Sequence, residues 1–169
     1  NGVTTGIKNT IIGGLAGDAI TTGANNVALG FEALSANTGS NGNVAIGYES
    51  LETFNVTSDT TTFNTAVGTQ AGKAMTTGTS NTLIGGLAGQ AITTGTYNDA
   101  LGRSSLYTNT TGAYNVAIGS SSLQNNTTAN DNTGVGYKAL YANTTGAQNT
   151  ALGGYSLDAN TTGLDNTAL

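Results

Sequence analysis

The side chains that could do acid–base or metal chemistry here are the nine carboxylates, because the sequence contains no His and no Cys. Those two residue types supply most nucleophile–base pairs and transition-metal sites. Only Glu32 and Glu49 share a phase of the repeat described below in successive copies. Calcium needs several converging oxygens, so this pair is better interpreted as a solvated surface pair. We therefore expect a protein that is not an enzyme and uses no metal and no cofactor.

The elements that would position any functional residue are defined by ten asparagines, each of which begins a copy of one short phrase. Eight of the nine intervals between them have the same length, and the interval from Asn43 to Asn64 is longer by four residues. With each Asn as position 1, the unit reads N-[T/V]-A-[I/L]-G-x-x-[A/S]-L-x-x-N-T-T-G-x-x. Periods of roughly 20 residues are typical of solenoids, whose units bury their apolar sides against one another. The asparagines are Asn9, Asn26, Asn43, Asn64, Asn81, Asn98, Asn115, Asn132, Asn149 and Asn166.

The repeat predicts an all-β protein, a parallel β-solenoid of about ten 17-residue coils. Positions 1 to 5 alternate with the two-residue period of a strand. Gly at positions 5 and 15 predicts corners with positive φ. We treat residues 1–169 as a single array without separate domains, and interpret both ends as lying within a repeat of a longer array. Apolar residues make up 37% of the chain at fixed phases, which argues against disorder.

The expected strand is apolar on both faces. Position 4 is always branched and apolar, and we expect it to fill the core. Position 3 is small or apolar, so it is either buried inside the same chain or packed against another subunit. Because a 17-residue coil can hardly cover its own outer side, we favour the subunit interface. The predicted core is Ile12, Leu29, Ile46, Val67, Ile84, Leu101, Ile118, Val135 and Leu152. The predicted interface is Ala28, Ala45, Ala66, Ala100, Ala117 and Ala151.

In most repeats a large apolar side chain occurs at position 9 or at position 12, but not at both. Most repeats carry Leu at position 9 and Asn at position 12, as in Leu106 with Asn109, whereas Gly89 is followed by Ile92. Cores resist both voids and overpacking, so these two positions are expected to share one interior space.

The asparagines at position 1 are expected to be structural. Identical amides stacked in successive coils can hydrogen-bond along the axis as a ladder. The same explanation covers most asparagines at position 12.

Two features could carry recognition. The four extra residues lie within 53–63, and a bulge with a polar tip flanked by aromatic rings makes Phe54, Asp59 and Phe63 a possible recognition loop. The repeated Thr-Thr at positions 13 and 14 predicts threonine columns, which would suit an ice-binding surface. Local hydroxyl bonding beside a corner is the simpler explanation.

Composition excludes several partners. The net charge is −5 and the four cations are scattered, so nucleic acid is not an expected partner. No apolar run approaches the roughly 20 residues that cross a bilayer, so we expect no membrane insertion. No signal peptide is visible.

The phrases Asn43-Val44-Ala45-Ile46-Gly47 and Asn115-Val116-Ala117-Ile118-Gly119 resemble the head repeats of trimeric autotransporter adhesins, the YadA-like heads. They are also similar to N-T-A-x-G repeats of phage tail fibres and large bacterial surface proteins. The resemblance covers essentially the whole chain, although its coils are longer than those typical of adhesin heads. It implies a left-handed parallel β-roll whose three copies associate side by side, outside the cell or on a virion.

Together these features predict a structural, non-catalytic segment of an extracellular, cell-surface or virion fibre or adhesin. Its expected partner is itself, as a homotrimer, and a cell-surface glycan or receptor is a possible ligand. Two alternatives stay open: a self-assembling filament joined end to end, and an ice-binding solenoid that uses its threonine columns.

Overall fold

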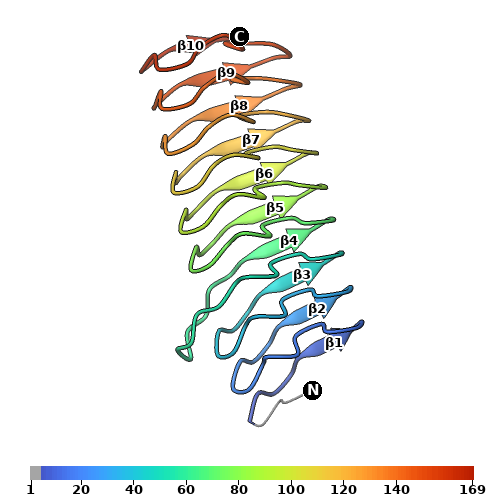
Figure 1. The fold of residues 1–169 in the computed structure, drawn as a ribbon. Coiled ribbons are helices and arrows are strands. Elements are labelled where there is room, and N and C mark those ends of the chain that lie inside the picture. The colour runs from blue at the N-terminus through green and yellow to red at the C-terminus, as the bar shows by residue number, and fades with distance from the viewer. Residues whose placement is uncertain (1–4) are drawn as a thin grey trace.

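The computed structural model, which describes residues 5–169, is a single β-solenoid with no helix in that range. Ten parallel strands form one sheet in sequence order (Figure 1), so the predicted all-β solenoid is confirmed. The first and last strands lie at opposite ends of the stack. The strands are β1 (Thr10–Ile12), β2 (Val27–Leu29), β3 (Val44–Ile46), β4 (Thr65–Val67), β5 (Thr82–Ile84), β6 (Asp99–Leu101), β7 (Val116–Ile118), β8 (Thr133–Val135), β9 (Thr150–Leu152) and β10 (Thr167–Ala168).

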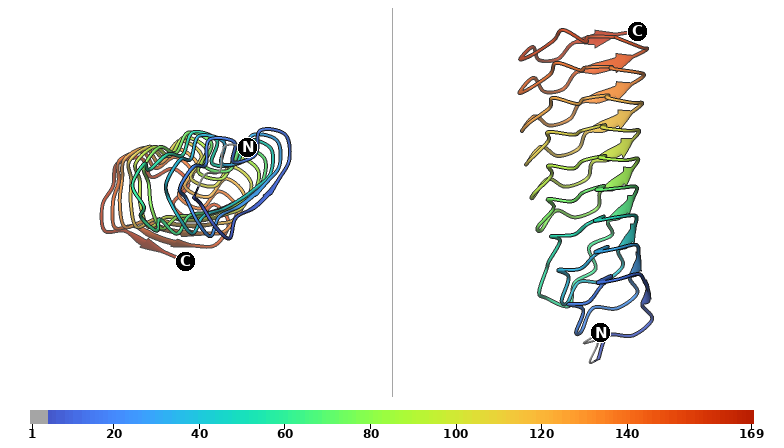
Figure 2. Two further views of the ribbon diagram at one scale, coloured as in Figure 1. Left: turned by 90° about the horizontal axis from the view of Figure 1, so that it is seen from below. Right: turned by 45° about the vertical axis from the view of Figure 1, so that its right-hand side comes forward.

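Each coil contains one short strand followed by a long return path. We number the coils 1 to 10 from their position-1 asparagines, and call the side chains at one repeat position a row. Viewed along the axis, the coils superpose as flattened loops that rotate progressively (Figure 2). The register matches equivalent positions, and it survives the insertion, since Ala45 pairs with Ala66 just as it pairs with Ala28. The return path is also bonded from coil to coil, as when the Glu32 N–H donates to the Gly14 carbonyl at 3.0 Å.

The two faces of the strand are the reverse of the sequence prediction. Position 4 points outward, so its assignment to the core is wrong. Ile12, Ile118 and Leu152 expose 60%, 40% and 51% of their surface. The same row contains Leu29, Ile46, Val67, Ile84, Leu101 and Val135, all of which are exposed or half-buried.

Position 3 is the inner row, so its assignment to a subunit interface is also wrong. All six predicted interface residues are fully buried within one chain: Ala28, Ala45, Ala66, Ala100, Ala117 and Ala151. The reason is space. Leucines of row 9 such as Leu106 and Leu123 fill the interior opposite the strand. A thin coil then has room for only a methyl group on the inward face of its strand.

The predicted sharing of space by positions 9 and 12 is confirmed. A Cβ added at Gly89 would lie 2.8 Å from Ile92 Cδ1, and one added at Gly17 would lie 2.9 Å from Ile20 Cδ1. Row 3 takes part as well, because the same Gly89 Cβ would lie 2.8 Å from Leu83 Cδ2. Side chains of three rows therefore share one interior space.

The corners rely on left-handed backbone far more than the glycine pattern indicated. Gly30 has φ +134°, and a Cβ there would lie 2.5 Å from the Gly47 carbonyl oxygen, so position 5 requires glycine. Positions 7, 9 and 17 also have positive φ while carrying ordinary side chains, such as Leu106 with φ 50°. Gly23 at position 15 has no positive φ. Glycine is favoured there because the next coil passes close by, and an added Cβ would lie 2.6 Å from the Ser40 carbonyl oxygen.

Candidate interaction surface

The asparagines of position 1 form a ladder that runs through the interior. The Asn81 amide nitrogen Nδ2 donates to the Gly95 carbonyl at 2.9 Å. Its Oδ1 accepts the backbone N–H of Asn98 at 3.0 Å and the Asn98 Nδ2 at 3.1 Å. The rungs from Asn26 to Asn149 are buried. These side chains hold successive coils in register and are inaccessible to a ligand.

A second, shorter ladder follows position 12 through coils 6 to 9. The Asn126 Nδ2 donates to Asn109 Oδ1 at 3.1 Å, and the Asn143 Nδ2 donates to Asn126 Oδ1 at 2.9 Å. Asn160 continues it with a bond of 3.1 Å to Asn143. These amides also bond successive coils to one another and are not part of an interaction surface.

The outward rows 2 and 4 of the ten strands form one continuous surface, which we call the outer face. Row 4 is entirely Ile, Leu and Val, row 2 is Thr or Val with one exception, and the two rows contain one charged residue, Asp99. Ten strands at ~4.8 Å spacing and three residues at ~3.3 Å give a strip of roughly 480 Å². Within this strip, row 4 is a continuous aliphatic stripe, and row 2 is threonine in most coils. An exposed apolar stripe on a soluble protein is often functional.

The insertion contributes less to recognition than its sequence suggested. Phe54 is fully buried and belongs to the core cluster, so its prediction as a recognition residue is wrong. It occupies position 12, where other coils place Ile, Met or Asn. Asp59 is exposed and accepts a hydrogen bond from Asn41 Nδ2, and Phe63 is 67% exposed. These two residues remain available to a ligand.

The threonine columns differ in what their hydroxyls do. In row 13, Thr93 Oγ1 donates to the Thr110 carbonyl and Thr110 Oγ1 to the Thr127 carbonyl, both at 3.1 Å. These hydroxyls are thus hydrogen-bonded to the next coil, which agrees with the simpler explanation of hydroxyl bonding beside a corner. Row 14, for example Thr111 and Thr128, is exposed.

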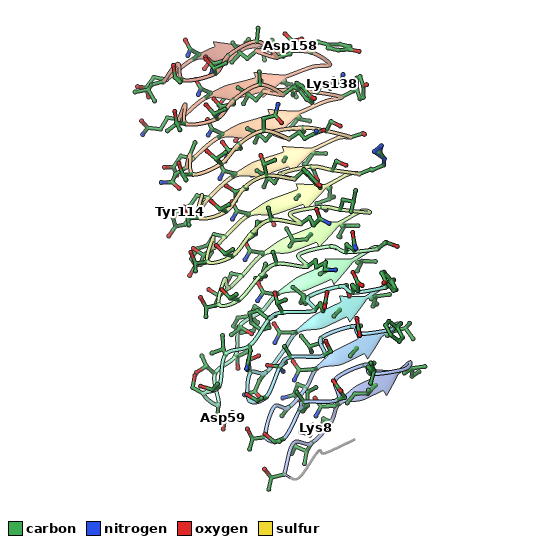
Figure 3. All side chains as sticks on the ribbon, in the orientation of Figure 1. Lys8, Asp59, Tyr114, Lys138 and Asp158 are labelled. Carbon is green, nitrogen blue, oxygen red and sulfur yellow. The ribbon has the colours of Figure 1, made fainter. Side chains whose placement is uncertain are left out.

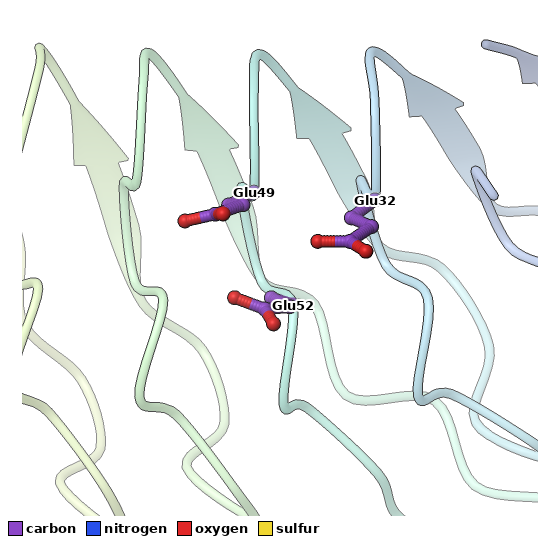
Figure 4. Close-up of side chains that lie close together, drawn as sticks. All are labelled: Glu32, Glu49 and Glu52. Carbon is purple, nitrogen blue, oxygen red and sulfur yellow. The ribbon is translucent and has the colours of Figure 1, made fainter. Parts of the chain in front are cut away.

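The carboxylates at one corner of coils 2 and 3 form a cluster with a lysine of coil 4. Glu32, Glu49 and Glu52 lie close together at this corner (Figure 4). One carboxylate oxygen of each lies within 4.8 Å of the other two. Lys73 Nζ forms ion pairs with Glu49 and, at 3.1 Å, with Glu52. Gln70 Nε2 donates to Glu49 Oε2 at 2.8 Å. We call the three glutamates and Lys73 the Glu–Lys cluster.

The cluster acts chemically as an ion-pair network that ties coil 3 to coil 4. Glu49 is only 8% exposed, so its prediction as a solvated surface residue is wrong. Glu32 is half-buried and has no ion pair within residues 5–169. The ammonium group of Lys73 lies against two of the three carboxylates that could otherwise share a cation. Lys73, more than any other neighbour, lowers the pKa of Glu49 to about 2.

Acid should weaken this network. Because the folded-state pKa of Glu49 lies below its ordinary value of 4.5, its contribution to stability is complete above about pH 4.5 and is lost as the pH falls towards 2. We expect Glu49→Gln to remove part of the loss in urea midpoint between pH 5 and about pH 2.5. Asp165→Asn, at an exposed position, is the control. A Glu49→Gln profile parallel to that of the wild type would contradict this role.

Exposed aromatic side chains line the corners, and the repeat analysis missed them because they vary from coil to coil. Phe31 and Tyr48 stack in row 6 with ring centroids 5.9 Å apart, and Tyr97 and Tyr114 stack in row 17 at 5.1 Å. Figure 3 shows Tyr114 at the outer edge of its coil. A search for tyrosines at non-consensus positions would have found them.

Comparisons of the chain with protein-family models, with curated proteins and with solved structures gave no match. Between residues 5 and 169, no helix is present that is long and apolar enough to cross a membrane.

Proposed function

We propose that this chain is a rigid, non-catalytic segment of an extracellular or virion fibre, in which three copies associate side by side. The observation that carries the proposal is the outer face. Along the whole stack an aliphatic row 4 runs beside a mostly threonine row 2, and Asp99 is the one charged residue of the two rows. Nothing in residues 5–169 covers this face, since the exposed row 4 residues lie outside the coils.

Rigidity supports the same function. Every coil is bonded to its neighbours along the strand, along the return path and through the buried asparagine ladder. Such a stack resists local opening, because few backbone groups are free to unpair alone. A shaft or head that must hold a surface away from a cell or particle needs this property.

The proposed interface is tested by placing charge on it. We expect a wild-type mass of three chains by light scattering, independent of concentration, and a mass of one chain for Ile118→Asp. A carboxylate would be desolvated in the interface without a partner. The fold should survive, because position 118 is 40% exposed in the single chain.

Thr128→Asp adds the same charge at an exposed site outside the outer face and should leave the trimer intact. A wild-type monomer would refute side-by-side assembly. Mass that grows without limit as concentration rises would instead indicate end-to-end filaments.

A further inference from the structure

Four side chains at one corner of coils 8 and 9 form an aromatic and basic group, which we call the Tyr–Lys patch. It comprises Tyr137, Lys138, Tyr141 and Tyr155. Two of its rings are exposed, and its lysine and third ring are half-buried. Tyr137 and Tyr155 expose 47% and 56% of their surface, and their rings meet edge to face with centroids 5.2 Å apart. Figure 3 labels Lys138 near the C-terminal end of the stack.

The ammonium group of Lys138 is held by rings and not by a carboxylate. Its Nζ lies 4.9 Å from the ring centroid of Tyr141 and 5.5 Å from that of Tyr137, both within cation–π distance. In residues 5–169, no carboxylate lies within ion-pair distance of it, whereas Lys73 is paired with two. The positive charge of Lys138 is therefore positioned but not neutralised.

Small residues flank the exposed ring of Tyr137, whereas Tyr141 lies in row 10 between Gln124 and Asp158. In row 6, Tyr137 lies between Ser120 and Gly154 of the adjacent coils, and in row 7 Lys138 follows Ser121. A Cβ added at Gly154 would meet only the Tyr137 carbonyl oxygen, at 3.8 Å. The fold does not need these side chains, because other coils carry residues such as Gly, Ser or Thr in row 6, Ser, Gln or Glu in row 7, and Ser, Gln or Asp in row 10.

We propose that the Tyr–Lys patch binds an acidic glycan, through one pyranose ring that carries a carboxylate or sulfate group. Tyrosine offers an apolar ring for the C–H face of a sugar and a hydroxyl for its polar edge. Lys138 supplies the charge-assisted hydrogen bond to the anionic group. The proposal deepens the fibre function and rests on it, since a surface fibre is where a glycan would be met.

One observation favours a sugar over an acidic peptide, and a second indicates that an anion is held by Lys138 and not by the charge of the whole chain. Strands β8 and β9 are paired on both sides, so neither offers a free edge to an extended peptide. The whole chain carries a net charge of −5, so long-range attraction of anions is unfavourable. Retention of an anion then depends on this local cation.

The test is binding of the full chain to immobilised glycans. The panel contains sialylated, uronate-containing and sulfated oligosaccharides, each beside its neutral core. We expect acidic members to be retained above their neutral cores, with the carboxylate and sulfate arms showing which anion is preferred. Lys138→Gln and Tyr155→Ser should each weaken binding about tenfold or more, the scale of one charge-assisted contact or ring. Gln and Ser both occur natively in row 7, at Gln70 and Ser121, so both variants should fold.

Arg103→Gln is the matched control, since it removes the same charge from an exposed row 6 position outside the patch and should not change binding. Equal binding to acidic and neutral glycans, wild-type binding by Lys138→Gln, or equal weakening by Arg103→Gln would each overturn the proposal. Light scattering on the same samples distinguishes failure of the proposed glycan site from failure of the proposed side-by-side assembly. A trimer that retains no acidic glycan refutes the patch alone, and a monomer that retains it refutes the fibre assembly alone.

Discussion

Ala117→Arg is expected to abolish the folded solenoid, or to destabilise it by more than about 4 kcal/mol. Ala117 is fully buried in β7, between Ala100 and Gly134 of the adjacent strands. The space it faces is filled, since a Cβ added at Gly134 would lie 2.7 Å from Ser122 Oγ. A guanidinium there would be buried without a partner and would force the coil open. Thermal unfolding followed by circular dichroism should show a midpoint lowered by roughly 10 °C or more.

Ile118→Arg is the control, because it places the same side chain one residue further along the same strand. Residue 118 points outward, so this variant should keep the fold and lose only side-by-side assembly. The sequence alone predicted the reverse for these two positions. A stable Ala117→Arg protein together with an unfolded Ile118→Arg protein would mean that the strand faces are assigned the wrong way round.

The second large effect is expected from Asn81→Ala. The substitution leaves the Gly95 carbonyl without its amide donor and the Asn98 N–H without its acceptor, both inside the stack. A buried polar group left unpaired costs about 1–3 kcal/mol, so the two together should lower the free energy of unfolding by roughly 2–6 kcal/mol. Urea denaturation measures the change through its midpoint.

Asn125→Ala removes an amide of the same kind from a half-buried site where, within residues 5–169, its side chain makes no hydrogen bond. Position 11 is Ala in most coils, so the free energy of unfolding should change by less than about 0.5 kcal/mol. Equal effects of the two substitutions would show that the ladder adds nothing beyond local packing.

Parts of the interaction surface could be read from the sequence and parts could not. The apolar character of rows 3 and 4 was evident, and so was the absence of His and Cys. Only part of the Glu–Lys cluster could be predicted from the sequence. Glu32 and Glu49 share a phase of the repeat, but Lys73 comes from position 10 of another coil. The Tyr–Lys patch was missed because Tyr137, Lys138 and Tyr141 occupy three different rows. Side chains from different rows meet only when the return path is folded.

The period, the parallel register and the number of coils follow from the repeated phrase alone. When one phrase recurs at a constant interval, equivalent residues of successive copies pair with one another. The insertion after Phe54 lengthens one interval but leaves this pairing unchanged. The exchange between positions 9 and 12, as in Gly89 with Ile92, also identified side chains that share an interior.

Which face of the strand lies inside depends on the packing of the whole coil. Strand alternation requires rows 3 and 4 to point in opposite directions but does not say which points inward. The volume of the coil makes that choice. Leucines from the return path, such as Leu106, already fill the interior, so the methyl group of Ala100 fits there and the larger side chain of Leu101 must face outward. Leu83 and Ile11, whose side chains occupy space that Gly89 and Gly17 leave open, were the traces of this rule in the sequence.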